Sequence, residues 1–116
     1  MAELLWDYFN VTVIDRNDYF EHVQGVVKAM VDPEFVDKVV HPFDKMAQAY
    51  TKMTFKQASL ETVNKNNSID IKTKEGTVET VTFYYLIICT GFSYNQPLRD
   101  HNSIKISDRR ASLLEF

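Results

Sequence analysis

The stretch that decides the fold is Val11–Asp15, which reads VTVID. Its β-branched residues and its closing acid are typical of a short strand that is buried on both faces of a parallel sheet. A second apolar stretch, Leu86–Cys89, reads LIIC and runs into Thr90 and Gly91. It predicts another buried strand in the core of the same sheet.

A small antiparallel meander is predicted between these two stretches, at about residues 54–85. Phe55–Val63 is expected to be extended, and two runs of alternating apolar and polar residues follow it at 69–74 and 80–85. Alternation is the pattern of half-buried strands. Short polar turns separate the runs, so successive strands are expected to pair antiparallel.

Helices are expected around this strand pattern, which makes the fold class α/β. Residues 2–9 carry an apolar stripe without a capping residue, which indicates the end of a longer helix. Gly25–Val31 and Glu34–Val40 are expected to be short helices, and the Asp-Pro pair between them would cap the second. Another helix is expected to begin within Asp108–Phe116.

The composition is typical of a globular domain and argues against a transmembrane or a nucleic-acid-binding protein. The chain has 116 residues, of which 45% are hydrophobic and 25% are charged, and these values are ordinary for one globular domain. No run approaches the roughly 18–20 apolar residues that cross a bilayer. The net charge of −3 argues against nucleic acid as a main partner, because a phosphate-binding face needs a basic excess.

The cysteine count, the histidine spacing and the N-terminal residues argue against a disulfide, a metal site and a signal peptide. Cys89 is the only cysteine, so an internal disulfide and a CxxC pair are excluded. The histidines lack metal-ligand spacing, and no metal site is expected. Acidic residues stand where a signal peptide would carry basic ones. We therefore expect a cytoplasmic protein, with peripheral attachment to mitochondrial or other membranes left open.

Two places carry candidate chemistry. Asp15 ends a predicted parallel strand, and in nucleotide-binding α/β folds an acid at this position accepts hydrogen bonds from ribose hydroxyls. Thr90 and Gly91 end the other predicted strand, where small residues let a dinucleotide approach the backbone closely. Each place also has a plain structural interpretation, as a turn or capping aspartate and as an ordinary strand end.

The order of these features resembles a known family, the two-dinucleotide-binding flavoproteins of the pyridine nucleotide-disulfide oxidoreductase fold. Within it the likeness is to apoptosis-inducing-factor homologues of the ferroptosis-suppressor type and to type II NADH dehydrogenases. Residues 11–20, VTVIDRNDYF, resemble the family's second strand with its ribose-binding acid. Residues 86–91, LIICTG, resemble the family's strand ending in Ala-Thr-Gly, with Cys89 in place of Ala.

The resemblance implies a partial Rossmann-like FAD-binding domain over residues 1–98, with the meander inserted in it. Residues 99–116 would be a linker and the start of an NAD(P)H-binding domain. The family's activity is the transfer of electrons from NAD(P)H through FAD to a small-molecule acceptor such as a quinone.

Four residues take site roles by this resemblance, all in cofactor binding and none in catalysis. Asp15 would hold the FAD ribose, Arg16 would flank the adenine, and Thr90 and Gly91 would lie against the dinucleotide. The family's reductases that use a dithiol carry a cysteine pair, which is absent here, so the flavin-only branch is favoured.

The phosphate-binding loop of the family is missing from the chain. Its glycine-rich fingerprint lies about 20 residues before the acid, yet 14 residues precede Asp15, and Gly25, Gly76 and Gly91 all follow it. We therefore expect a fragment truncated at both ends, which by itself folds weakly, binds FAD poorly and is inactive as an enzyme.

Two alternatives remain open. The first is a non-catalytic nucleotide-binding or interaction module, the product of a truncated or degenerate gene. The second is a different Rossmann-like enzyme, such as a methyltransferase, in which an acid after the second strand also binds ribose. The predicted meander favours the flavoprotein, because methyltransferase sheets generally continue with alternating helices.

Overall fold

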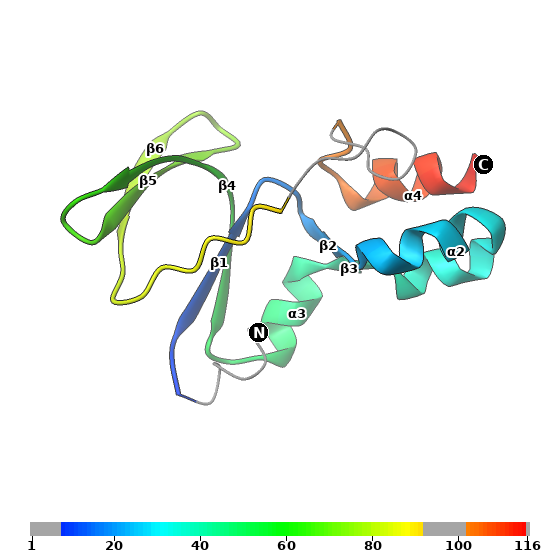
Figure 1. The fold of residues 1–116 in the computed structure, drawn as a ribbon, viewed down its shortest axis with the longest axis horizontal. Coiled ribbons are helices and arrows are strands. Elements are labelled where there is room, and N and C mark those ends of the chain that lie inside the picture. Colours follow the sequence, from blue (N-terminus) through cyan, green and yellow to red (C-terminus); the bar gives the residue numbers. More distant parts are fainter. Residues whose placement is uncertain (1–7, 92–101, 116) are drawn as a thin grey trace. The chain divides into compact units, whose positions relative to one another are not determined.

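The computed structural model describes residues 8–91 and 102–115, and its strands and helices gather in two units (Figure 1). We call residues 8–16 and 52–91 the sheet unit, and residues 17–51 and 102–115 the helical unit. Each unit joins segments that are far apart along the chain. Both therefore depend on contacts that no short stretch of sequence specifies.

The sheet unit contains a mixed four-stranded sheet in the order β1-β4-β5-β6 (Figure 1). Its strands are β1 Val11–Asp15, β4 Met53–Asn64, β5 Ser68–Thr73 and β6 Val78–Thr82. β1 and β4 are parallel, whereas β4, β5 and β6 form an antiparallel meander. The predicted strand at residues 11–14 is confirmed within β1. The meander predicted at about residues 54–85 is also confirmed, but its last strand ends at Thr82.

The long strand β4 belongs to both parts of this sheet. Its residues 53–57 pair with β1, and its residues 58–64 pair with β5. A bulge interrupts the second pairing between Leu60 and Thr62, and bulges bend a strand and increase its twist. One continuous strand thereby links a parallel pair to a meander.

Alternation along β5 places its apolar residues in the core, as predicted. Ile69 and Ile71 are buried and form a cluster with Ala58. Asp70, between them, accepts hydrogen bonds from Thr80 Oγ1 at 2.6 Å and Asn64 Nδ2 at 3.1 Å. Because successive side chains point to opposite faces, β5 is apolar on one face and hydrogen-bonded on the other.

Two expectations about burial are wrong. No residue of β1 is fully buried, so β1 is not a strand covered on both faces. Leu86–Cys89 forms no strand: Ile87 and Ile88 are 53% and 59% exposed. A strand needs a hydrogen-bonding partner along its edge. Among the described strands, β1 is paired with β4 alone, and none of them pairs with residues 86–89.

The helical unit combines short helices with a two-stranded antiparallel sheet (Figure 1). The strands are β2 Tyr19–Glu21 and β3 Val40–Pro42. The helical elements are the 3-10 helices η1 Val23–Gly25 and η2 Pro33–Lys38 and the α-helices α2 Val26–Val31, α3 Phe43–Ala49 and α4 Ile106–Leu114.

Helical spacing explains which of these residues are buried. In α2, Val26 and Ala29 lie three residues apart, and in α4, Arg109 and Leu113 lie four apart, so each pair occupies one helix face. These faces enclose the core of the helical unit, which contains Tyr19, Val26, Ala29, Val36, Val39, Val40 and Leu113.

The expected helices are confirmed in part. Residues 25–31 are helical from η1 into α2, and α4 begins two residues before the expected start at residue 108. The expected helix at 34–40 is instead a 3-10 helix, Pro33–Lys38, and Val40 pairs in β3. Asp32 occupies its N-cap position without a side-chain hydrogen bond. The expected helix at 2–9 falls mainly on residues 1–7, which lie outside the described residues, and so does the expected domain boundary at 98–99.

Candidate functional site

The predicted ribose-binding acid lies at the carboxyl end of a parallel strand. Asp15 is the last residue of β1, is half-buried, and is paired in register with Gln57 of β4. The Gln57 side chain donates from Nε2 to the Arg16 carbonyl at 3.1 Å. This bond holds the turn that follows the strand. Ligands of open α/β sheets bind at this end of parallel strands.

The other predicted site residues lie in the same unit. Arg16 is exposed and directly follows Asp15, so these two are together by sequence. Thr90 and Gly91 are exposed as well, at the end of the segment after Phe83. Gly91 has a φ of +67°, in the left-handed region that favours glycine. These two residues do not end a buried strand, contrary to expectation.

A second acid after β1 has a structural role that the sequence analysis missed. Asp18 Oδ1 accepts a hydrogen bond of 2.8 Å from the amide of Ile106, the first residue of α4. Its own amide donates to the Ile104 carbonyl at 3.1 Å, and its carbonyl accepts from the Phe43 amide at 3.0 Å. A carboxylate at a helix N-terminus is favourable. Asp18 therefore fixes the start of α4 against the beginning of β2.

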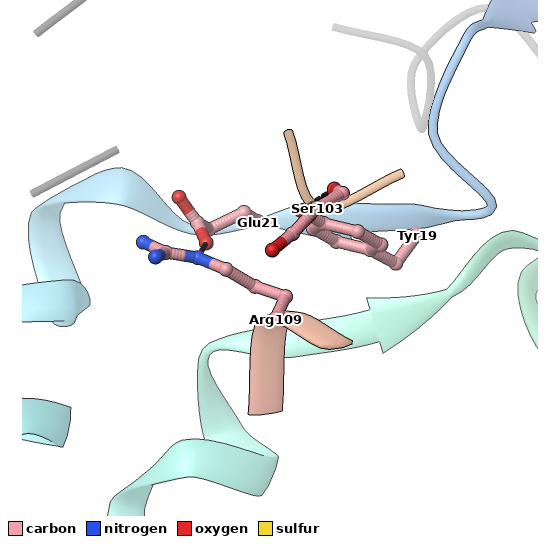
Figure 2. A network of polar contacts seen from close by, with 4 residues as sticks. All are labelled: Tyr19, Glu21, Ser103 and Arg109. Atoms are coloured by element: carbon pink, nitrogen blue, oxygen red, sulfur yellow. Dashed lines mark hydrogen bonds and ion pairs between the residues drawn. The ribbon is translucent and has the colours of Figure 1, made fainter. Parts of the chain in front are cut away.

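Arg109 is a buried charged residue that the sequence did not single out. Figure 2 shows Arg109 of α4 directed at Glu21 of β2, with Nε donating to Oε2. The side chains of Arg109 and Glu21 are 1% and 10% exposed. Close by, the Tyr19 hydroxyl donates to the Ser103 carbonyl at 2.7 Å. These contacts join positions 84 to 88 residues apart, so no local motif could have signalled them.

The network in Figure 2 stabilises the helical unit rather than offering a reactive group. An ion pair removed from water is held by its mutual attraction, and removing one partner leaves an uncompensated charge. Arg110, the next residue, pairs with Asp37 at 2.8 Å, but its side chain is 42% exposed. Arg109 is therefore expected to contribute more to the stability of the helical unit than Arg110.

Two carboxyl groups of the meander have lowered pKa values. Hydrogen bonds from Thr80 and then Asn64 lower the pKa of Asp70, because they favour the charged form. The backbone amide of Glu75, with the Thr73 hydroxyl, lowers the pKa of that residue. Both shifts favour ionised carboxylates in turns and strands, so neither group is suited to act as a general acid or base near neutral pH.

The part of the chain that the structure describes has neither a cluster of metal-ligating side chains nor a membrane-spanning helix. Within residues 8–91 and 102–115, no group of three or more His, Cys, Asp or Glu side chains could hold a metal ion. In the same residues, no helix has the length and apolar character needed to cross a membrane.

Comparison with known proteins gives two similarities, both to proteins of Dictyostelium discoideum. Apoptosis-inducing factor homolog B is 34% identical over 110 residues, which are 91% of this chain and 26% of that protein. Apoptosis-inducing factor homolog A is 30% identical over 99 residues, or 85% of this chain and 22% of that protein. No family model and no solved structure matches the chain. The chain is thus similar to apoptosis-inducing factor homologs over most of its own length and about a quarter of theirs.

Proposed function

We propose that the chain is part of an FAD-dependent oxidoreductase that passes electrons from NAD(P)H through the flavin to an acceptor such as a quinone. The observation that carries the proposal is Asp15 at the carboxyl end of a parallel strand, in a chain similar to two apoptosis-inducing factor homologs. The domain limits proposed with it are residues 1–98 for a partial FAD-binding domain and 99–116 for a linker and the start of an NAD(P)H-binding domain.

The strand order supports this proposal. In a Rossmann-type sheet of order 3-2-1-4, strands 2 and 3 are neighbours, and strand 1 separates strands 2 and 4. β1 and the start of β4 fit strands 2 and 3, because they are adjacent and parallel (Figure 1). Leu86–Cys89 fits strand 4. A strand from outside the described residues would then lie between this segment and β1, which accounts for the exposure of Ile87 and Ile88.

The residues present fit the ribose end of FAD. Asp15 would accept hydrogen bonds from the ribose hydroxyls, Arg16 would flank the adenine, and Thr90 and Gly91 would lie against the dinucleotide. FAD, when bound, supplies the hydride chemistry, and the protein's part is to bind and orient it.

The residues present do not fit the pyrophosphate. That group needs glycines close to a helix N-terminus beside the first strand. Gly25 is packed against Val39 in the helical unit, and Gly76 lies in the turn between β5 and β6. Gly91 ends the segment after Phe83. No redox step is therefore assigned to the side chains of this chain.

The alternative function is a non-catalytic nucleotide-binding or interaction module. Its specific support is the exposed apolar surface of the segment after β6, where Tyr84, Tyr85, Ile87 and Ile88 are 98%, 77%, 53% and 59% exposed. Scattered apolar residues at a surface are ordinary, but a contiguous set marks a surface that another element covers. In the flavoprotein proposal, that element is the missing strand.

A hybrid protein tests the proposal. The matching quarter of Apoptosis-inducing factor homolog B is replaced by this chain, and bound flavin is measured by absorbance after purification. We expect the hybrid to retain FAD, and its Asp15→Ala variant to bind FAD at least about tenfold more weakly, because charge-assisted hydrogen bonds to ribose are lost. Asp44→Ala, an exposed acid of α3, is the matched control and should leave binding unchanged.

A folded hybrid without flavin, shown by a native-like circular dichroism spectrum, would contradict the proposal and favour the non-catalytic module. Equal flavin binding by the Asp15→Ala variant would remove the ribose role from this residue. Oxidation of NADH or NADPH with a quinone, measured on the flavin-loaded hybrid, then tests the electron transfer itself.

A further inference from the structure

A hollow of about 340 Å³ opens on the helical unit, at η1, α2, η2 and the residue after η2. This volume is at the small end of the range found for ligand pockets. Its lining residues are His22, Gln24, Gly25, Lys28, Phe35, Lys38 and Val39. None of them has a role in the proposed function, so the hollow is a separate feature.

Positive charge converges on one aromatic ring at this hollow. The Lys28 ammonium lies 4.2 Å from the centre of the Phe35 ring, and the Lys38 ammonium lies 5.5 Å from it. An ammonium near a ring face is attracted by the negative face of the ring. The two lysines come from α2 and η2, so two elements bring their charges to one place.

Among the residues that the structure describes, no carboxylate lines the hollow to neutralise these lysines. Two acids lie on η2 itself, Glu34 and Asp37, and both are exposed. Asp37 is paired with Arg110 at 2.8 Å, so its charge is balanced by that arginine. His22 and Gln24 add polar groups to the rim and no negative charge. The rim is therefore cationic although the whole chain carries a net charge of −3.

The wall beneath this rim is apolar and closely packed. A Cβ added at Gly25 would lie 2.8 Å from Val39 Cγ2 and 3.5 Å from Phe35 Cε1. Contacts below 3.0 Å are not seen for real Cβ atoms, so only glycine lets η1 approach Val39 this closely. Val39 is buried and Phe35 is half-buried. Because Val39 is buried, Phe35 supplies most of the apolar surface that a ligand entering the hollow can reach.

We propose that this hollow binds an organic anion with an aromatic body. The aromatic part packs against the accessible part of Phe35, and the anionic group accepts charge-assisted hydrogen bonds from Lys28 and Lys38. A bare inorganic anion leaves the apolar wall in water, and an aromatic cation is repelled by the lysines. The site therefore requires both parts of the ligand.

Titration of the full 116-residue chain with phenyl phosphate, followed by amide chemical shifts in NMR, tests the proposal. We expect saturable shifts at residues 22–39, at least about tenfold weaker binding of inorganic phosphate and no binding of benzamidine. The double variant Lys28→Gln, Lys38→Gln should weaken phenyl phosphate binding at least about tenfold. The matched control, Lys45→Gln with Lys105→Gln, removes two exposed lysines of the helical unit away from the hollow.

Any of the following results would overturn the proposal. They are equal affinity for phenyl phosphate and inorganic phosphate, an equal loss of affinity in the control double variant, and shifts located outside residues 22–39. All four exchanged lysines are exposed, so the variants should keep the native spectrum. That spectrum is recorded for each variant before titration, and a double variant that keeps it and also keeps full affinity contradicts the proposal too.

Discussion

The sheet unit and the helical unit bury their apolar side chains to different extents. The main cluster of the helical unit has seven buried residues, drawn from β2, α2, η2, β3 and α4 and from the residue after η2. Among the described residues of the sheet unit, one cluster has three, Ala58, Ile69 and Ile71, and large apolar residues after β6 stay exposed. Elements from distant parts of the chain enclose the first core. In the sheet unit, the described residues leave one edge of β1 and the segment after β6 without a covering strand.

The ion pairs of the two units also differ in how deeply they are buried. The helical unit contains a buried ion pair between Glu21 and Arg109 (Figure 2). In the sheet unit, an ion pair joins Lys56 and Glu79 at 2.6 Å, and its side chains are 40% and 42% exposed. Exposed pairs contribute little, whereas a buried pair is costly to break. Long-range electrostatics therefore matter more to the helical unit.

The largest expected effect comes from breaking the buried pair. Arg109→Ala should lower the free energy of unfolding by about 3–5 kcal/mol, because Glu21 would remain buried without its partner. Urea denaturation followed by circular dichroism measures this loss. Arg110→Ala is the matched control and should cost about 0–1 kcal/mol, since its pair with Asp37 is exposed.

A double replacement separates charge from packing at the same place. Glu21→Leu combined with Arg109→Leu should recover most of the lost stability, because apolar partners of similar volume often replace a buried pair without loss. If the double variant is as unstable as Arg109→Ala, the contribution of Arg109 lies in its shape rather than its charge.

In the sheet unit, shortening a buried side chain should destabilise the chain more than shortening an exposed one. Ile71→Ala should cost about 2–5 kcal/mol, because Ile71 is 0% exposed and its removal leaves a cavity. Ile88→Ala, at a position 59% exposed, should cost less than about 0.5 kcal/mol. The same urea experiment compares them, and an equal cost at Ile88 would mean that residues 86–89 are buried in solution.

A smaller loss is expected at the start of α4. Asp18→Ala should lower stability by about 0.5–2 kcal/mol, the usual range for removing a helix-capping side chain. Hydrogen exchange of the Ile106 amide, which donates to Asp18, should become faster in this variant. Unchanged exchange would show that the capping bond is not formed in solution.

The smallest effect concerns pH in the meander. Hydrogen bonds lower the pKa of Asp70 in the folded chain, so its contribution is complete above the ordinary aspartate pKa of about 3.9 and is lost as the pH falls below it. The stability difference between the native chain and Asp70→Asn should therefore shrink from pH 6 to pH 3. A difference that stays constant across this range would contradict the role of the charged form.

Local patterns in the sequence were enough for β1 and the strands of the meander, but they did not predict β2 or β3 and they failed at residues 86–89. The alternation at residues 69–74 correctly predicts β5 with Ile69 and Ile71 on the core side. Side-chain alternation is a property of a single strand and can be read along the chain. The apolar run at 86–89 fails as a strand prediction, because strand formation also depends on an edge that accepts it.

In the candidate site too, some residues could be predicted from a local pattern and others depend on distant partners. The position of Asp15 at the carboxyl end of β1 could be predicted, since the acid directly follows a β-branched run. The capping role of Asp18 could not, because its partner Ile106 is 88 residues away. Likewise, nothing in the sequence around Lys28 or Lys38 indicates that their ammonium groups meet at one phenylalanine ring.

By itself, the sequence determined the α/β class, the meander and the place of Asp15 at the end of a strand. The tertiary structure decided that β1 pairs with β4, that Leu86–Cys89 stays out of the sheet, and that Arg109 is buried against Glu21. The reason is physical: periodicity and residue propensity act over a few neighbouring positions, whereas hydrogen-bond pairing between strands and burial of charge depend on segments that only folding brings together.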